Sequence, residues 1–167
     1  MKRYALLLAA LVATASCNNV VTGLAPSSNP ATETFAASLG VDIAAMSRTV
    51  DGVYFLEVAT GTGPEVISTT DSLFVTYSGY LKDGTLFDAG TNVLFTLGNV
   101  IPGFRSGLFG MKEGGRRKLV IPSDLGYGSR SQRDPATGEI TIPRQSTLIF
   151  DVHVLKVHNP ADTTAAS

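Results

Sequence analysis

The side chains that usually carry nucleophilic, acid–base or metal chemistry are few in this chain of 167 residues. It has one cysteine, Cys17, and two histidines, His153 and His158, both near the C-terminus. A Cys/His metal site or a disulfide framework therefore has too few members. Ser78 and Ser106 lack the GxSxG context of a nucleophile elbow, so we do not expect hydrolysis. The sequence predicts neither a metal nor a cofactor.

Aromatic and aliphatic side chains offer a different chemistry, the binding of an apolar group away from water. Residues 100–122, VIPGFRSGLFGMKEGGRRKLVIP, are apolar, then glycine-rich, then basic, and contain one acid, Glu113. Considered alone, rings such as Tyr77, Phe104 and Phe150 are more often core than pocket. Residue type by itself therefore leaves both interpretations open.

One helix is predicted among the elements that must position these rings, and it begins inside this stretch. Pro102 suits the first helical turn, where its missing N–H has no cost. An apolar stripe follows at i, i+4 and i+7, formed by Phe104, Leu108 and Met111. The glycine pair at 114–115 is expected to end the helix.

Strand patterns dominate the rest of the central region. In SLFVTYSGYL the apolar residues Leu73, Val75 and Tyr77 alternate with polar ones, and Asp83-Gly84 follows as a hairpin turn. VYFLEVATGTG, LFTLG, RKLVIP and TLIFDVHVLKV behave similarly, and the last places Leu148, Phe150, Val152 and Val154 on one face. The predicted fold class is α+β, an antiparallel half-barrel of about five strands wrapped around one short α-helix.

The charge pattern gives no indication of a nucleic-acid partner. Thirteen Lys and Arg residues face fourteen Asp and Glu residues, a net charge of −1, whereas nucleic-acid binding requires a basic surface. Arg116, Arg117 and Lys118 form a small basic run, which we interpret as a solvated strand edge. His153 is expected to be a surface residue.

Residues 1–17 carry the features of an export signal. Basic Lys2 and Arg3 precede YALLLAALVATAS, an apolar run too short to span a membrane but suited to a signal peptide. The ending ATASC resembles a bacterial lipobox, so we predict lipidation of Cys17 and a membrane anchor. Because Asn18 follows the cysteine in place of Asp, the outer membrane or periplasm is favoured. An ordinary secretory signal cut nearby is the alternative.

The remaining chain divides into three predicted parts. Residues 18–48 begin with Asn, Ser, Thr, Pro and Ala and are expected to form a flexible tether. Within it, helical spacing allows a short helix at Phe35, Leu39, Ile43 and Met46, although a loosely ordered leader explains the pattern equally well. Residues 49–157 form the folded domain, and residues 158–167 a disordered tail.

Four separated motifs resemble the FKBP-type peptidyl-prolyl cis-trans isomerases. They are VTYSGYLKDGTLFD, VIPGF, GMKEGGRRKLVIPSDLGYG and IPRQSTLIFDVHVLKV, and GTGPEV before them resembles the family's opening strand and turn. The resemblance runs from about Thr49 to Val157. It implies a half-barrel wrapped on one short helix, in agreement with the periodicity described above.

The resemblance also implies a pocket between sheet and helix that receives a proline ring. Phe104 would form its floor, while the Ile101 N–H and the Tyr127 hydroxyl would donate to ligand carbonyls. The implied catalytic residues are Tyr77, Phe87, Asp88, Ile101, Phe104, Tyr127 and Phe150, with Val100 and Ile142 as further substrate-binding residues.

Two departures from the family's pattern affect these expectations. Phe104 stands where the family often has Trp, and the smaller ring is expected to loosen the fit for large macrolide inhibitors of the FK506 type. The segment GSRSQRDPATGEIT, between Tyr127 and Ile142, is expected to be longer than usual, with a turn at Asp134-Pro135 and Thr137-Gly138. It either tunes substrate choice or is a surface loop.

Three functional hypotheses follow from these observations. The leading one is a lipid-anchored, monomeric isomerase that helps exported proteins to fold, with proline-containing polypeptides as clients and a macrolide as inhibitor. The alternative is a weakly catalytic, proline-binding chaperone on the same anchor. A third is a structural lipoprotein that self-associates through residues 35–46.

Overall fold

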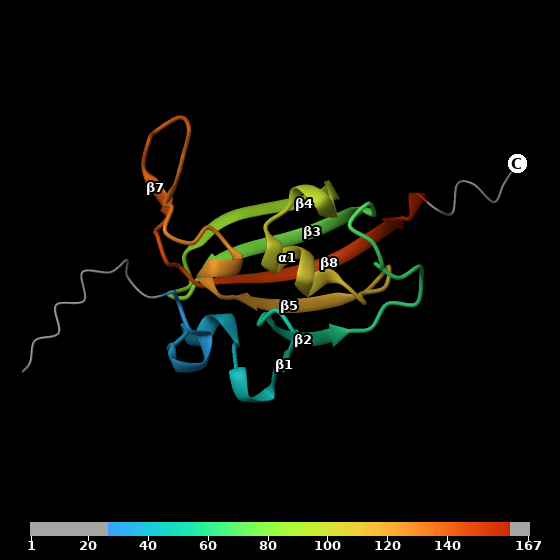
Figure 1. Cartoon of the computed structure of the whole chain (residues 1–167), viewed down its shortest axis with the longest axis horizontal. Coiled ribbons are helices and arrows are strands. Elements are labelled where there is room, and N and C mark those ends of the chain that lie inside the picture. Colours follow the sequence, from blue (N-terminus) through green and yellow to red (C-terminus); the bar gives the residue numbers. More distant parts are fainter. Residues whose placement is uncertain (1–26, 161–167) are drawn as a thin grey trace, which may run out of the picture.

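A six-stranded antiparallel sheet forms most of the computed structural model, which describes residues 27–160 (Figure 1). Its strands are β1 (Ser47–Arg48), β2 (Tyr54–Ala59), β3 (Ser72–Leu81), β4 (Leu86–Thr96), β5 (Arg116–Ile121) and β8 (Leu148–His158). Hydrogen bonds join them in the order β1-β2-β5-β8-β3-β4. The predicted α+β class is confirmed, and the strand beyond the expected five is the two-residue β1.

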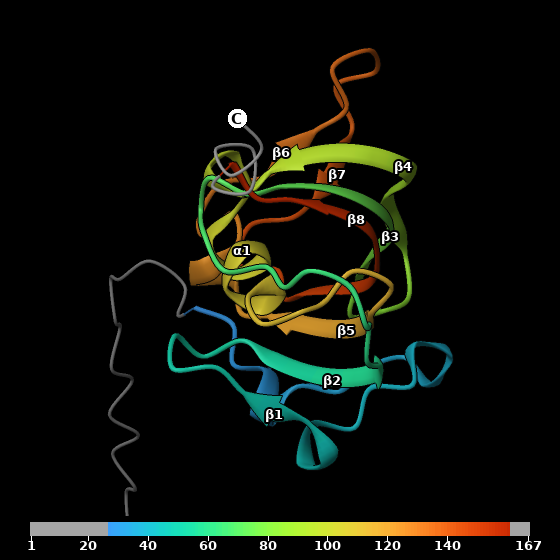
Figure 2. The ribbon, with the colours of Figure 1, turned by 90° about the vertical axis from the view of Figure 1, so that its right-hand side faces the viewer.

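The sheet curls around one short helix, α1 (Pro102–Leu108), which lies on its concave side (Figure 2). The concave side carries the main core, which includes Leu73, Val75, Leu108, Leu119 and Val154. The described residues also form five 3₁₀ helices: η1 (Pro30–Thr32), η2 (Ala37–Leu39), η3 (Ile43–Ala45), η4 (Leu97–Asn99) and η5 (Ser123–Leu125). The predicted inward face of β8 is confirmed, because Leu148, Phe150, Val152 and Val154 all belong to this core.

Helix α1 begins at Pro102, as predicted, but ends earlier than the sequence indicated. It stops at Leu108, and Gly110 adopts a left-handed conformation (φ 76°) two residues later. The predicted end at 114–115 was wrong, because the backbone leaves the helical conformation at Phe109 (φ −56°, ψ 139°). Arg117 donates hydrogen bonds to the Gly107 and Phe109 carbonyls at 2.7 and 3.0 Å. Met111 is still buried in the core, but outside the helix.

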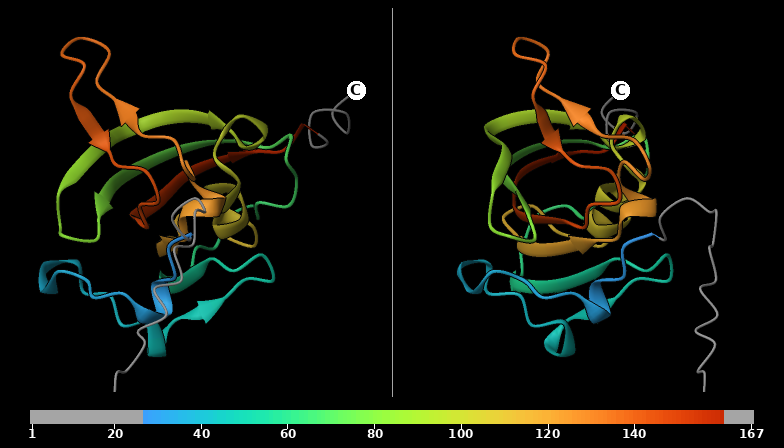
Figure 3. Two further views of the ribbon diagram at one scale, coloured as in Figure 1. Left: turned by 60° about the vertical axis from the view of Figure 1, so that its left-hand side comes forward. Right: turned by 90° about the vertical axis from the view of Figure 1, so that its left-hand side faces the viewer.

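Two hairpins shape the rim of the half-barrel. The predicted turn between β3 and β4 is present, with Gly84 at φ 90° and the Leu81 N–H donating to the Thr85 carbonyl at 2.9 Å. The second hairpin joins β6 (Gln132–Arg133) to β7 (Ile140–Ile142) and projects from the body (Figure 3). Its tip is closed by the Asp134 side chain, which accepts from two backbone N–H groups, as the turn prediction anticipated.

Residues 27–48 lie against the convex side of the sheet. Leu39, 6% exposed, packs with Val120 of β5 and Ile149 of β8. The predicted short helix is absent in this part of the chain, where two 3₁₀ helices separated by Gly40 (φ 57°) take its place. The contact with the sheet explains the apolar spacing, because the segment covers the domain's own outer face. Residues 1–26 and 161–167, including Cys17 and most of the predicted tail, lie outside the described residues.

The basic run at 116–118 is not a solvated strand edge. Strand β5 pairs with β2 on one side and β8 on the other, and the Arg117 side chain is buried, with the residue 7% exposed. Arg117 forms an ion pair with Glu57 at 2.6 Å and its guanidinium lies 4.7 Å from the Phe55 ring centre. That prediction was wrong, because the helix C-terminus offers carbonyl partners that a sequence pattern does not reveal.

Candidate functional site

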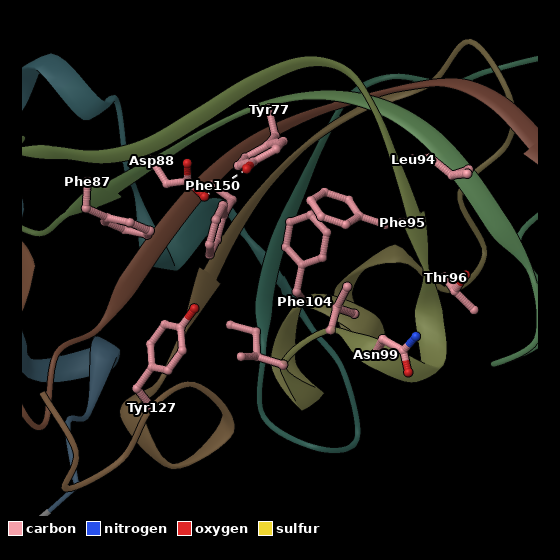
Figure 4. A pocket seen from close by; sticks show the side chains of 12 residues that line it. Tyr77, Phe87, Asp88, Leu94, Phe95, Thr96, Asn99, Phe104, Tyr127 and Phe150 are labelled. Carbon is pink, nitrogen blue, oxygen red and sulfur yellow. Dashed lines mark hydrogen bonds between the residues drawn. The ribbon is translucent and has the colours of Figure 1, made fainter. Parts of the chain in front are cut away.

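A cavity of about 540 Å³ opens between the curled sheet and the start of α1 (Figure 4). Strand β4 and the η4 turn supply several of its walls, while the other lining residues come from β3, α1, β8 and the turn after η5. The lining residues are Tyr77, Phe87, Asp88, Leu94, Phe95, Thr96, Asn99, Val100, Ile101, Phe104, Tyr127 and Phe150. Four separate stretches of the chain, at residues 77, 87–104, 127 and 150, therefore contribute to one mainly apolar cavity.

Phe104 lies at the centre of a cluster of aromatic rings. Its ring centre is 5.0 Å from that of Phe150, 6.0 Å from Phe95 and 6.4 Å from Tyr77, each in an edge-to-face arrangement. Such arrangements match the positive edge of one ring with the negative face of another. Phe104 is itself 4% exposed, so its position is fixed by the core below and the neighbouring rings.

Asp88 interacts with two tyrosines of the cavity. The Tyr77 hydroxyl donates to Asp88 Oδ2 at 2.8 Å, joining the two paired strands β3 and β4. Burial raises the pKa of Tyr77 to about 12, with the hydrogen bond to Asp88 and the charge of that carboxylate adding to the effect. Burial, and secondarily Asp88, also raises the pKa of Tyr127. Both phenols therefore stay protonated near neutral pH and remain hydrogen-bond donors.

Gly79 provides the space that two of the rings occupy. It lies on β3 between Asp88 of β4 and Phe150 of β8. A Cβ atom there would sit 2.7 Å from the Phe87 ring and 2.8 Å from the Phe150 ring. These rings meet at 89° with their centres 5.5 Å apart. The absence of a side chain at Gly79 thus permits this wall of the cavity.

Val100 and Ile101 reach the cavity because η4 and α1 are almost continuous. The Ile101 carbonyl accepts the first helical hydrogen bond, from the Arg105 N–H at 3.1 Å. Among residues 27–160, the Ile101 N–H has no acceptor. Donors that precede the first helical turn lack intrahelical partners, so this N–H is available to a ligand.

Eight of the nine residues expected at the site line the cavity, and Ile142 is the exception. Ile142 ends β7, is 4% exposed and packs within the core. Sequence reasoning missed Leu94, Phe95, Thr96 and Asn99. Leu94 and Phe95 gave a recognisable signal, as apolar positions in the predicted strand LFTLG. Thr96 and Asn99 are polar residues at the end of β4 and in η4, and gave none.

Two kinds of feature are absent from the described residues, a metal-binding cluster and a membrane-spanning helix. Between residues 27 and 160, no group of three or more His, Cys, Asp or Glu side chains is arranged to hold a metal ion. Within the same range, no helix is long and apolar enough to cross a membrane.

Comparisons with known proteins place the chain in a family. A sequence model of the family "FKBP-type peptidyl-prolyl cis-trans isomerase" matches residues 63–155. An FK506-binding protein of Neisseria meningitidis is 42% identical over 104 residues, which cover 59% of this chain and 89% of that protein.

Solved structures extend the comparison to the fold. A peptidyl-prolyl cis-trans isomerase from Pseudomonas syringae superposes with a TM-score of 0.63 at 31% identity, covering 74% of this chain and 87% of that one. FkpA from Escherichia coli gives 0.58 at 38% identity, covering 68% and 51%. The antiparallel sheet curled around one short helix is thus a fold that this chain shares with a peptidyl-prolyl cis-trans isomerase. The chain belongs to the FKBP-type peptidyl-prolyl cis-trans isomerases.

Proposed function

We propose that the cavity binds a proline ring of a polypeptide and that the preceding X–Pro peptide bond rotates there between cis and trans. The observation that carries this proposal is the cluster of Tyr77, Phe104 and Phe150 around one cavity, with Asp88 beside it. Flat aromatic surfaces suit a small saturated ring, and the cavity also has room for the residue that precedes the proline.

Rotation about a peptide bond requires no covalent bond to be broken. The barrier of about 18–20 kcal/mol arises from the partial double-bond character of the C–N bond. The planar amide is more dipolar than the twisted transition state, so removing water from it disfavours the ground state. Each 1.4 kcal/mol of differential binding accelerates the rotation about tenfold. A dry, preformed cavity that holds the ring while the carbonyl turns would therefore accelerate it.

Two donors are suited to hold the carbonyl oxygens of the substrate. The free Ile101 N–H lies at the start of α1. The Tyr127 hydroxyl points into the cavity (Figure 4). Asp88 fixes the Tyr77 hydroxyl and keeps it from competing for those oxygens. Phe87, Phe150 and Val100 would enclose the ring. Ile142 is not retained as a substrate contact, because it lies in the core.

The clients we propose are proline-containing polypeptides that fold after export, and the protein would be held by a lipid on Cys17. The signal-like residues 1–17 and the ATASC sequence support this placement. Replacing Cys17 with Ser should abolish incorporation of labelled fatty acid and release the protein from membranes. If the Cys17→Ser variant still incorporates the labelled fatty acid, Cys17 does not carry the lipid anchor.

We further propose that the protein acts as a monomer. The apolar residues of 35–46, which offered a self-association surface in the sequence, instead cover Val120 and Ile149 of the chain's own sheet. An FK506-type macrolide is the inhibitor we expect to compete for the cavity, as the name of the Neisseria relative suggests.

A protease-coupled assay on a proline peptide tests the proposal directly. The protein lacking residues 1–17 should accelerate the cis-to-trans step, and an FK506-type macrolide should suppress the acceleration. Phe104→Ala and Tyr127→Phe should reduce it, while Thr34→Ala, an exposed change in the N-terminal segment, should not. If the unaltered protein gives no acceleration but still prevents aggregation of an unfolded client, the chaperone hypothesis replaces the isomerase.

A further inference from the structure

Ser123 forms hydrogen bonds to three separate parts of the chain near the candidate site. It begins η5 and is 0% exposed. Its carbonyl accepts hydrogen bonds from the N–H groups of Gly126 at 3.0 Å and Gly128 at 2.7 Å. These two residues flank Tyr127, so one oxygen holds the backbone on both sides of the tyrosine whose hydroxyl points into the cavity.

The N-terminal segment supplies the partners of the remaining polar groups of Ser123. The Ser28 N–H donates to Ser123 Oγ at 2.8 Å, and the Ser123 N–H donates to Ser28 Oγ at 2.7 Å. Ser123 Oγ donates in turn to Gln145 Oε1 at 2.9 Å. Ser28 therefore satisfies a buried N–H whose partner is costly to remove. Ser28 also lies outside residues 63–155, the part that matches the family.

Ser28 is held in place by the segment that follows it. Pro30 is buried, and the Ala36 N–H donates to the Lys82 carbonyl at 2.8 Å. Leu39 then packs on Val120 and Ile149. The reciprocal pair of hydrogen bonds is thus one end of a continuous contact between the N-terminal segment and the sheet.

We propose that Ser28 is a positioning residue for Tyr127: the reciprocal hydrogen bonds between Ser28 and Ser123 fix the turn that directs the Tyr127 hydroxyl into the cavity. The consequence for activity rests on the proposed function, in which that hydroxyl binds a substrate carbonyl. A catalytic group must be held within about 0.5 Å of its working position, and a group on a loop depends on such support. The N-terminal segment would then be part of the isomerase.

Substitutions at position 28 in the full chain test this inference. Ser28→Ala removes the acceptor of the Ser123 N–H, and Ser28→Thr keeps it. Asn29→Ala is the matched control, because the exposed Asn29 side chain bonds only to Ala31 in its own 3₁₀ turn. We expect Ser28→Ala to lower kcat/KM for a proline peptide by roughly threefold to tenfold. Ser28→Thr and Asn29→Ala should stay near the wild-type value.

An NMR readout separates positioning from a general loss of stability. The ring signals of ¹³C-labelled tyrosines, assigned with Tyr127→Phe, should shift or broaden at Tyr127 in Ser28→Ala and stay unchanged at Tyr54, well below the unfolding temperature. Unchanged Tyr127 signals would overturn the proposal. So would changed signals with an unchanged kcat/KM, or failure of Ser28→Thr to restore both. If the wild-type chain shows no isomerase activity, the proposed function fails, while the ring signals still decide whether Ser28 positions Tyr127.

Discussion

The Tyr77 hydroxyl donates a hydrogen bond to Asp88 Oδ2 at 2.8 Å, across the paired strands β3 and β4. Tyr77 also lies edge-on to Phe104, with ring centres 6.4 Å apart. The Asp88 carboxylate thus fixes Tyr77, and Tyr77 in turn packs against Phe104 at the apolar floor of the cavity. This link joins Asp88, the one charged residue among residues 27–160 that lines the cavity, to the rings that we expect to contact proline.

Asp88→Asn is expected to lower the pKa of Tyr77 below about 12 but to leave it above the ordinary value of 10.0. The hydrogen bond to a carboxylate and its charge are lost, whereas burial, the largest cause, remains. Spectrophotometric titration of the phenols measures the change, with Tyr77→Phe identifying the signal. The Tyr127 pKa should fall as well, because Asp88 also raises it. A Tyr77 pKa that does not move would contradict the role assigned to Asp88.

The same pKa shift predicts how stability depends on alkaline pH. A tyrosine whose pKa is raised in the folded state binds its proton more tightly there than in the unfolded chain. The resulting stabilisation is fully present below pH 10 and is lost as pH rises toward about 12. Urea unfolding at a series of pH values should show that the free energy of unfolding falls less above pH 10 in Tyr77→Phe than in the wild-type protein. If the free energy of unfolding falls equally with pH in both proteins, folding does not raise the pKa of Tyr77.

Gly79→Ala is expected to lower both stability and activity. The new Cβ would lie 2.7 Å from the Phe87 ring and 2.8 Å from the Phe150 ring, so both rings must move. Overpacking of this kind costs about 1–3 kcal/mol. Gly98→Ala is a suitable control, because the nearest atom to its Cβ would be 3.4 Å away. Chemical denaturation and the isomerase assay give the two readouts, and an unchanged kcat/KM would mean that the rings do not contact the substrate.

Arg117→Met should destabilise the fold by about 3 kcal/mol, since it leaves Glu57 and the carbonyls of Gly107 and Phe109 without their partner. Arg116→Met, at the exposed neighbouring position, should change the free energy of unfolding by less than about 0.5 kcal/mol. Denaturant unfolding compares the two variants. If the two substitutions change the free energy of unfolding equally, Arg117 behaves as a solvated surface charge.

Local patterns were sufficient to predict β2, β3, β5, β8 and the end of β4, because each depends on neighbouring residues. The start of α1 at Pro102 and the turn at Gly84 were predicted for the same reason. The short strands β1, β6 and β7 were not predicted. The position of Phe95 in the cavity was not predicted, because it depends on how β4 pairs with another strand. A bulge in β4 switches the inward face from Asp88 and Gly90 to Val93 and Phe95, and Asn92 adopts φ 55° there. The bulge depends on the pairing partner in β3, which alternation within one strand does not reveal.

The site residues themselves were found through motif resemblance, since periodicity cannot distinguish a pocket ring from a core ring. That resemblance ended at the matched domain and gave no indication of the Ser28–Ser123 contact. Hydrogen bonds between residues 95 positions apart depend on how the whole chain folds. The burial of Arg117 was missed for the same reason, because its partners lie at the end of a helix that packs on β5 only in the folded protein.

Leu39→Ala tests whether the N-terminal segment stabilises the domain that it covers. Leu39 fills the convex-side cluster with Val120 and Ile149, and removing its buried methyl groups should cost about 2–3 kcal/mol. Ser38→Ala, at the adjacent exposed position, should have almost no effect. The unfolding midpoint measured by urea denaturation should therefore fall in Leu39→Ala. A midpoint equal to that of Ser38→Ala would mean that the segment is only loosely attached in solution.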